Sequence, residues 1–370
     1  MNIVGDIALL AVGLIAIVIV LDAVLRTFVL PRGAPVLFTN IVFRSVRAVL
    51  RVFARPSRGY EARDRVMALY APLALIVFPA VALVVIFGAF ACFFEATLGT
   101  GWREALVTSG SSLFTLGFDR PNGVGSASIA FAEAAIGLGL LAVLIAYLPT
   151  IYSSFSRRES MVTQLSVRAG TPPLAWRMLE LAHRAGFLQE LDPEWQDWMR
   201  WFAELSETHT SLGMLSFFRS PNPNRSWITS AGTVLDAAAL RLAILNIPYT
   251  PAPGLCIRSG YMALREIADF FGYDHDPDPS PDDPISISRD EFMEIYEQLG
   301  GAGLPIRPDR EQAWRDFSGW RVNYDRVLLA LCSLMMAPYA PWSSDRSPTA
   351  PLRRQRWLLR LHRGGPVGPV

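Results

Sequence analysis

The stretch SSLFTLGFDRP, residues 111–121, lies between two long apolar segments and is too short and too polar to cross a membrane. It combines hydroxyl side chains with one glycine and one aspartate. Unpaired backbone polar groups are costly in lipid, so such a turn is tolerated at membrane depth where protein surrounds it or water lines it. The fold therefore depends on what this turn does between its two apolar neighbours.

The composition is that of a chain with membrane-embedded and water-soluble parts. Of the 370 residues 51% are hydrophobic, and long apolar runs are concentrated in the first half. A net charge of +1 gives no reason to expect a nucleic-acid partner. Cys92, Cys256 and Cys332 are scattered, and the four histidines have no metal-ligand spacing. We therefore expect no disulfide framework, metal site or cofactor, and the sequence offers no nucleophile–base pair that would indicate an enzyme.

Three segments can cross a membrane as helices, which requires about 20 mainly apolar residues. They are residues 7–30, 67–94 and 126–154. In the first, Asp22 and Arg26 are one helical turn apart and able to form an ion pair. The sequence thus predicts an all-α membrane protein in which residues 1–31 form an N-terminal transmembrane helix.

The placement of arginine predicts the orientation, because loops on the cytoplasmic side carry an excess of basic residues. The link between the first and second spans is rich in arginine, and Arg157 and Arg158 follow the third span. We expect a multi-pass protein of the cell membrane with its N-terminus outside and its C-terminal domain in the cytoplasm.

Residues 34–58 are expected to form a basic amphipathic helix at the membrane interface. Apolar residues recur at helical spacing at Phe38, Val42, Val46, Val49 and Phe53. The apolar stripe should face the acyl chains, while the arginines should contact anionic lipid head groups. These lipid contacts are assigned to Arg44, Arg47, Arg51 and Arg55. Alternatively, the helix transmits movement to the second span.

Residues 102–114 are expected to form a short helix that enters the membrane without crossing it. The carbonyl end of a helix carries partial negative charge, and here it would point toward the membrane centre, where it could stabilise a cation. The chain would then return through Thr115, Leu116, Gly117 and Phe118, which offer a row of backbone carbonyls.

This order of span, short helix, TLGF and span resembles the pore module of potassium channels, whose filter signature is TVGYG. The resemblance covers residues 66–158 and implies a pore-loop module in a homotetramer, where filter carbonyls replace the hydration shell of K⁺ or another monovalent cation. It implies an ion filter at Thr115, Leu116, Gly117, Phe118 and Asp119. It also implies a pore-lining third span with a gating hinge at Gly137, Gly139 and Pro149.

Two features of this module differ from the family pattern or add to it. Asp119 follows Phe118 where the family has a second filter glycine. Either Asp119 adopts the left-handed conformation of that glycine, or one residue is deleted and Asp119 matches the aspartate that commonly follows the filter. Glu133 lies within the third span, and we expect it to support the filter by pairing with a hydroxyl of the short helix, Ser112 among them, or with Arg103.

The second half reads as a helical cytoplasmic domain over residues 159–342, followed by a basic, loosely ordered tail over residues 343–370. Ser288 and Glu291 form a capping-box signature at a helix start. Trp195, Trp198 and Trp201 recur on one face of a predicted helix, as expected of a core stripe. The expected helices cover residues 174–189, 193–208, 227–246, 259–271, 289–299 and 321–336.

The sequence therefore predicts a passive cation channel, with potassium as the expected ion. The alternative is a membrane-anchored sensor or interaction protein that keeps the pore-like fold without conducting.

Overall fold

The computed structural model describes residues 3–30, 36–54, 59–119 and 121–346. Their regular structure is helical, with no strand in these ranges, and Leu245 and Ile306 form an isolated bridge. The chain divides into two compact units. Unit 1 contains residues 1–155 and 211–218, and unit 2 contains residues 156–210 and 219–370.

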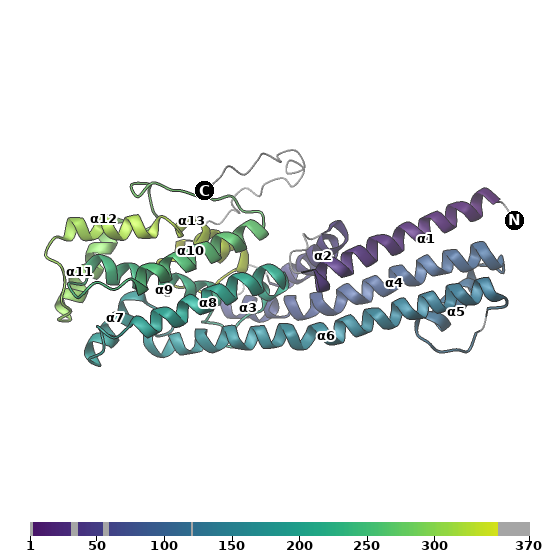
Figure 1. Cartoon of the computed structure of the whole chain (residues 1–370), viewed down its shortest axis with the longest axis horizontal. Coiled ribbons are helices and arrows are strands. Elements are labelled where there is room, and N and C mark those ends of the chain that lie inside the picture. The colour runs from purple at the N-terminus through teal and green to yellow at the C-terminus, as the bar shows by residue number, and fades with distance from the viewer. Residues whose placement is uncertain (1–2, 31–35, 55–58, 120, 347–370) are drawn as a thin grey trace. The chain divides into compact units, whose positions relative to one another are not determined.

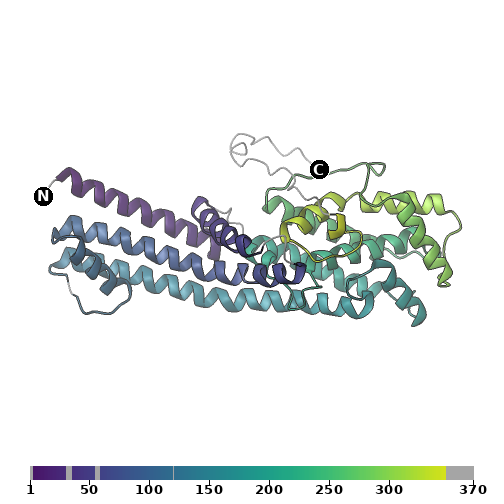
Figure 2. The same cartoon turned by 180° about the vertical axis from the view of Figure 1, so that it is seen from behind.

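Unit 1 is built on long apolar helices. They are α1 (Ile3–Val24), which continues as a π-helical turn at Leu25–Val29, α4 (Tyr70–Leu98) and the first part of α6 (Val124–Ala169). The short α5 (Trp102–Leu113) lies beside α4 and α6 near their ends (Figures 1 and 2). Asp22 and Arg26 form the ion pair that their spacing predicted, at 2.7 Å.

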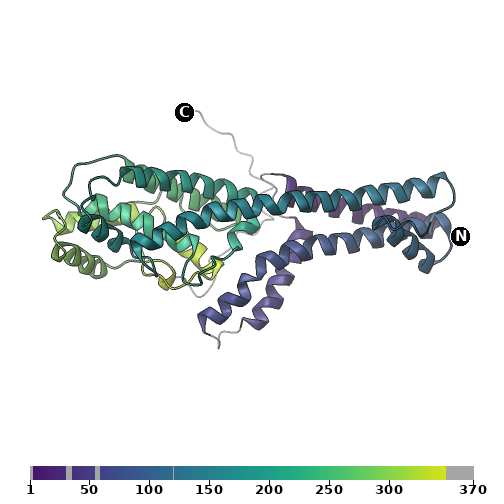
Figure 3. The same ribbon diagram turned by 90° about the horizontal axis from the view of Figure 1, so that it is seen from below.

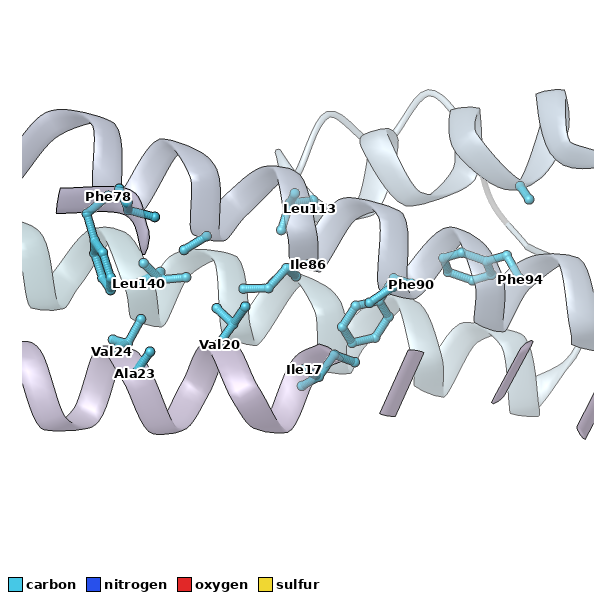
Figure 4. Close-up of a cluster of buried hydrophobic side chains, with 14 residues drawn as sticks. Ile17, Val20, Ala23, Val24, Phe78, Ile86, Phe90, Phe94, Leu113 and Leu140 are labelled. Carbon is cyan, nitrogen blue, oxygen red and sulfur yellow. The ribbon is translucent and has the colours of Figure 1, made fainter. Parts of the chain in front are cut away.

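The core of unit 1 fills the space between these helices. Ile17, Val20, Ala23 and Val24 of α1 point toward buried aromatic side chains of α4, and Leu113 and Leu140 close the cluster (Figure 4). Gly13 permits the close approach of α1 to α4, because a Cβ there would lie 2.7 Å from the Ala89 carbonyl oxygen.

Two shorter helices, α2 (Leu37–Phe53) and α3 (Tyr60–Ala68), lie side by side before α4 (Figure 3). The apolar stripe of α2 was expected to face lipid, but much of it packs against protein: Val42 is buried, and the Phe38 ring lies 5.7 Å from that of Phe78. Val49 and Phe53 of the expected stripe are exposed, as are Leu37, Ile41, Arg44, Arg51 and Val52. Arg55 lies outside the described residues.

Four described helices are long and apolar enough to cross a membrane, which is typical of a membrane protein. Three of them correspond to the expected spans. The fourth, α9 (Trp227–Ile244), is fully buried within the protein. A helix that is apolar on all sides is typical of the centre of a folded unit. This explains why α9 is as apolar as a membrane span.

Unit 2 packs further helices around α9. They are α7 (Ala175–Arg184), α8 (Asp192–Ser211), α10 (Ala252–Phe270), α11 (Arg289–Gly301), α12 (Arg310–Arg321) and α13 (Asp325–Met335), with η3 at Ser344–Arg346. The capping box at Ser288 and Glu291 is confirmed, and the three tryptophans of α8 are buried.

The start of the expected tail belongs to this unit. Ser343 is buried, and Arg346 forms an ion pair with Glu291. This pairing and the capping bonds from Ser288 lower the pKa of Glu291 to about 2. The rest of the tail, residues 347–370, lies outside the described part of the chain.

Candidate functional site

The turn after α5 has the backbone geometry that its glycine suggests. α5 ends at Leu113, within one residue of the expected boundary. Thr115 and Gly117 both have positive φ, 53° and 70°. A positive φ is rare for a residue with a Cβ and free for glycine, so the chain accepts backbone strain at Thr115 to make this turn.

The backbone N–H groups of the turn bond back to the end of α5. The Thr115 N–H donates to the Ser112 carbonyl oxygen at 3.0 Å, and the Leu116 N–H donates to that of Ser111 at 2.8 Å. Within the described ranges, no donor reaches the carbonyl oxygens of residues 115–118. Four successive carbonyls are therefore available to a ligand.

Asp119 is held against α5 by two hydroxyl side chains. The Thr108 hydroxyl donates to the Asp119 carboxylate. Ser111 makes two bonds to the Asp119 backbone: its Oγ accepts from the amide at 3.1 Å, and its hydroxyl donates to the carbonyl oxygen at 3.2 Å. Asp119 does not have a positive φ, so it does not take the left-handed conformation that was one of the two alternatives.

Glu133 of α6 lies behind α5 and is fully buried. Its Oε1 is 2.6 Å from the Ser109 hydroxyl, which also lies 2.9 Å from the Phe87 carbonyl oxygen of α4. Ser109 thus connects α5 to both long helices. Glu133 was expected to pair with a hydroxyl of the short helix or with Arg103, and it pairs with the hydroxyl of Ser109. Glu133 Oε2 has no hydrogen-bond partner in the described ranges.

Ser112, which was expected to support the filter, bonds elsewhere. Its hydroxyl donates to the Thr108 carbonyl oxygen within the same helix, at 2.9 Å. The hydroxyls that bond to Asp119 are instead those of Thr108 and Ser111, while the Ser109 hydroxyl bonds to Glu133 and Phe87. Their hydroxyl run was visible in the sequence, but which hydroxyl faces which neighbour depends on how α5 is rotated against α4 and α6.

The three residues proposed as a hinge have different surroundings. A Cβ on Gly137 would lie 2.7 Å from the Leu113 carbonyl oxygen, so this glycine lets α6 approach the end of α5. Gly139 has open space around its Cβ position, and Pro149 lies within α6, which is continuous from Val124 to Ala169.

Two stripes of exposed residues run along α6, which also exposes Leu141 and Leu148. The small-residue stripe consists of Ala132, Ala135, Gly139, Ala142 and Ala146, all exposed. Beside it runs an apolar ridge of larger exposed side chains, Phe131, Leu138, Ile145 and Tyr152, spaced seven residues apart. A seven-residue apolar repeat is the spacing of helices that pack along one another.

Comparison with known proteins adds no assignment: no family model, curated protein or solved structure matches this chain.

We predict that Ser109→Ala lowers the free energy of unfolding of the chain in detergent by about 1–3 kcal/mol, because it leaves the buried Glu133 carboxyl without its donor. Ser112→Ala is the matched control, since it removes a bond to a carbonyl of its own helix, and should change stability by less than about 0.5 kcal/mol. Denaturant unfolding followed by tryptophan fluorescence measures both. Equal losses in the two variants would contradict the assigned role of Ser109.

Proposed function

We propose that this chain is the subunit of a cation channel, in which copies of the 115–119 turn surround a central path for potassium or another monovalent cation. The observation that carries the proposal is that the carbonyl oxygens of residues 115–118 accept no hydrogen bond from the described residues, while the amides before Phe118 bond to α5. Backbone carbonyl oxygens without an internal donor can replace the water around a cation.

The electrostatics of α5 favour the same ligand. The turn follows the carbonyl end of α5, where the helix dipole is negative. Asp119 adds a carboxylate close to the turn, although its bond from Thr108 directs it toward α5. An anion would meet unfavourable charge from both sources, whereas a cation would be stabilised.

A multimer is needed because one chain leaves the turn uncovered. Leu116 and Phe118 are 61% and 67% exposed. In the proposed tetramer the apolar ridge of α6 packs against a neighbouring copy, and the small-residue stripe beside it lines the path. Small side chains leave that path wide, and the seven-residue spacing of the ridge suits packing between helices.

The proposed topology places the N-terminus and the 99–123 segment outside the cell, and unit 2 in the cytoplasm, following the excess of arginine in the link before α4 and after the third span. Arg44 and Arg51 are exposed on α2 beside Leu37 and Ile41, which suits contact with anionic lipid head groups at the inner surface.

The experiment is a flux measurement in liposomes together with the oligomeric state. Purified wild-type chain, reconstituted under a potassium gradient, should release potassium faster than protein-free liposomes and should be tetrameric by native mass measurement. Tetramers without flux would favour the alternative function, a membrane-anchored sensor that keeps the pore-like fold. A monomer in lipid would reject the channel.

A further inference from the structure

The segment between α8 and α9 belongs to unit 1, although both helices lie essentially in unit 2. Residues 211–218 cluster with unit 1, and they contain the turn η2 (Gly213–Phe217). Met214, Leu215 and Ser216 are buried. A connection on the surface would not bury these side chains, so the segment packs against protein and is not an exposed linker.

The docking contacts converge on Arg47 of α2. Its guanidinium carbon lies 5.3 Å from the centre of the Phe217 ring and 5.9 Å from that of Tyr70. The two rings are 5.3 Å apart and nearly perpendicular, at 84°. Both distances are within the range at which a cation is attracted to an aromatic ring. Arg47 thus joins α2, the first residue of α4 and η2, and it differs from the exposed Arg44 and Arg51 of the same helix.

Consecutive residues anchor the end of this segment to different units. The Phe218 ring lies 5.7 Å from that of Phe155, at the end of the unit 1 part of α6. The next residue, Arg219, donates through its guanidinium to the carbonyl oxygens of Met335 and Met336, at 2.7 and 3.2 Å, at the end of α13 in unit 2. Phe218 thus packs within unit 1, and the next residue bonds within unit 2.

The helix α4 links the aromatic contacts of Tyr70 to the helix before the candidate filter. Tyr70 begins α4, and the same helix presents the Phe87 carbonyl oxygen to Ser109 of α5. α4 is a continuous helix over this distance, with Pro79 inside it. A shift at its first turn can move along the helix axis as a rigid displacement.

We propose that Arg47, Tyr70 and Phe217 form an aromatic latch that couples residues 211–218 to α2 and to the start of α4, and that its opening regulates conduction. The first part is a statement about unit 1 alone, and the second rests on the proposed function. Arg47 is accordingly a positioning residue of the latch, in place of the lipid contact that its position on a basic helix suggested.

The test of coupling is hydrogen–deuterium exchange on the full chain in lipid nanodiscs. Arg47→Gln should raise the exchange rate about tenfold in two peptides at once, residues 37–53 and residues 211–218, a factor that corresponds to about 1.4 kcal/mol. Arg51→Gln removes a neighbouring exposed charge from the same helix and should change neither peptide.

The reciprocal variant separates coupling from local damage. Phe217→Leu keeps an apolar side chain without a ring. It should raise exchange in residues 37–53, a segment far from residue 217 in the sequence. Phe217→Tyr keeps the ring and should leave exchange as in the wild type. An effect of each variant confined to its own segment would overturn the latch.

Flux through liposomes tests the regulatory part. Arg47→Gln and Phe217→Leu should change the potassium flux in the same direction and by several-fold, while Arg51→Gln and Phe217→Tyr should match the wild type. Coupled exchange with unchanged flux would overturn regulation but keep the latch. A wild type without flux would reject the proposed function, and the exchange results would still decide whether the latch exists.

Discussion

Replacing Gly117 with valine is expected to reduce potassium flux to the level of protein-free liposomes while leaving the oligomer assembled. Gly117 has a φ of 70°, a region that a β-branched residue occupies rarely and at a cost of about 1–2 kcal/mol or more. The chain relieves this strain by rotating the peptide groups on either side of residue 117. The carbonyl oxygens of Leu116 and Gly117 would then leave the row on which the proposed function depends.

The loss of function should exceed the loss of stability, because the turn is exposed and a Cβ at residue 117 meets no atom within 4 Å. The strain is therefore conformational and local. Native mass measurement should still give the wild-type oligomer. Flux measured in the same liposomes would then report on the filter and not on assembly.

Gly125→Val is the matched control for this experiment. Gly125 also has open space around its Cβ position, but it lies in the first turn of α6 and does not have a positive φ. Its substitution adds the same atoms to a helical backbone and should keep most of the flux. Wild-type conduction by Gly117→Val would show that the 115–118 carbonyls do not hold the ion.

The elements found from the sequence are those with a strong local signal. The three expected spans and the short helix before the turn are present, and α5 ends at Leu113, one residue before the expected boundary. Apolar length identifies a span without reference to neighbours, and the capping residues Ser288 and Glu291 act within one turn. Both kinds of signal predict structure correctly because they depend on residues close together in the chain.

The elements that were missed depend on tertiary contacts. α12 was not expected, because its sequence is polar apart from Ala313, Trp314, Phe317 and Trp320. Trp314 and Phe317 pack against Phe292 of α11. α10 begins seven residues before its expected start, since Pro253 falls in the first turn, where proline is tolerated. Local propensity alone could not show α12, whereas the start of α10 depends on where one proline falls in the first turn.

The candidate site follows the same division. The sequence identified the turn, its glycine and the acidic residue of the third span, because these stand out as residue types. It could not select Thr108 and Ser111 over Ser112, since the choice depends on which side of α5 faces Asp119. Likewise, Arg47 resembles its neighbours in the sequence and differs from them only through the approach of Phe217, 170 positions later.

Arg321→Met should give the largest loss of stability in unit 2, about 3–5 kcal/mol. The Arg321 side chain is fully buried and bonds to Asp236 at 2.5 Å and to Asp325 at 2.8 Å. Removing one member of a buried ion pair leaves uncompensated charge in a medium that solvates it poorly, and this is the range of cost measured for such changes. Methionine is unbranched and close to arginine in volume, although shorter, so the loss reports on charge and hydrogen bonding more than on volume.

The remaining partners cannot replace the guanidinium. Asp236 still accepts from the Tyr324 hydroxyl at 2.8 Å, and Asp325 still accepts from Ser286, but two carboxylates would stay buried without a cation. Burial alone would lower the pKa of Arg321, yet the two carboxylates raise it, which keeps the guanidinium charged at every pH relevant to the fold. The Trp342 carbonyl oxygen, which accepts from Arg321 at 2.6 Å, also loses its donor.

Denaturant unfolding followed by tryptophan fluorescence measures this loss, with Arg315→Met as the control. Arg315 is exposed on the same helix and bonds to Gln312, so its replacement should cost less than about 0.5 kcal/mol. Adding Asp236→Asn to Arg321→Met removes one of the two stranded charges and should recover part of the stability. If the double variant were less stable than Arg321→Met alone, the cost would come from lost packing, and the ion network would not be what holds α9, α12 and α13 together.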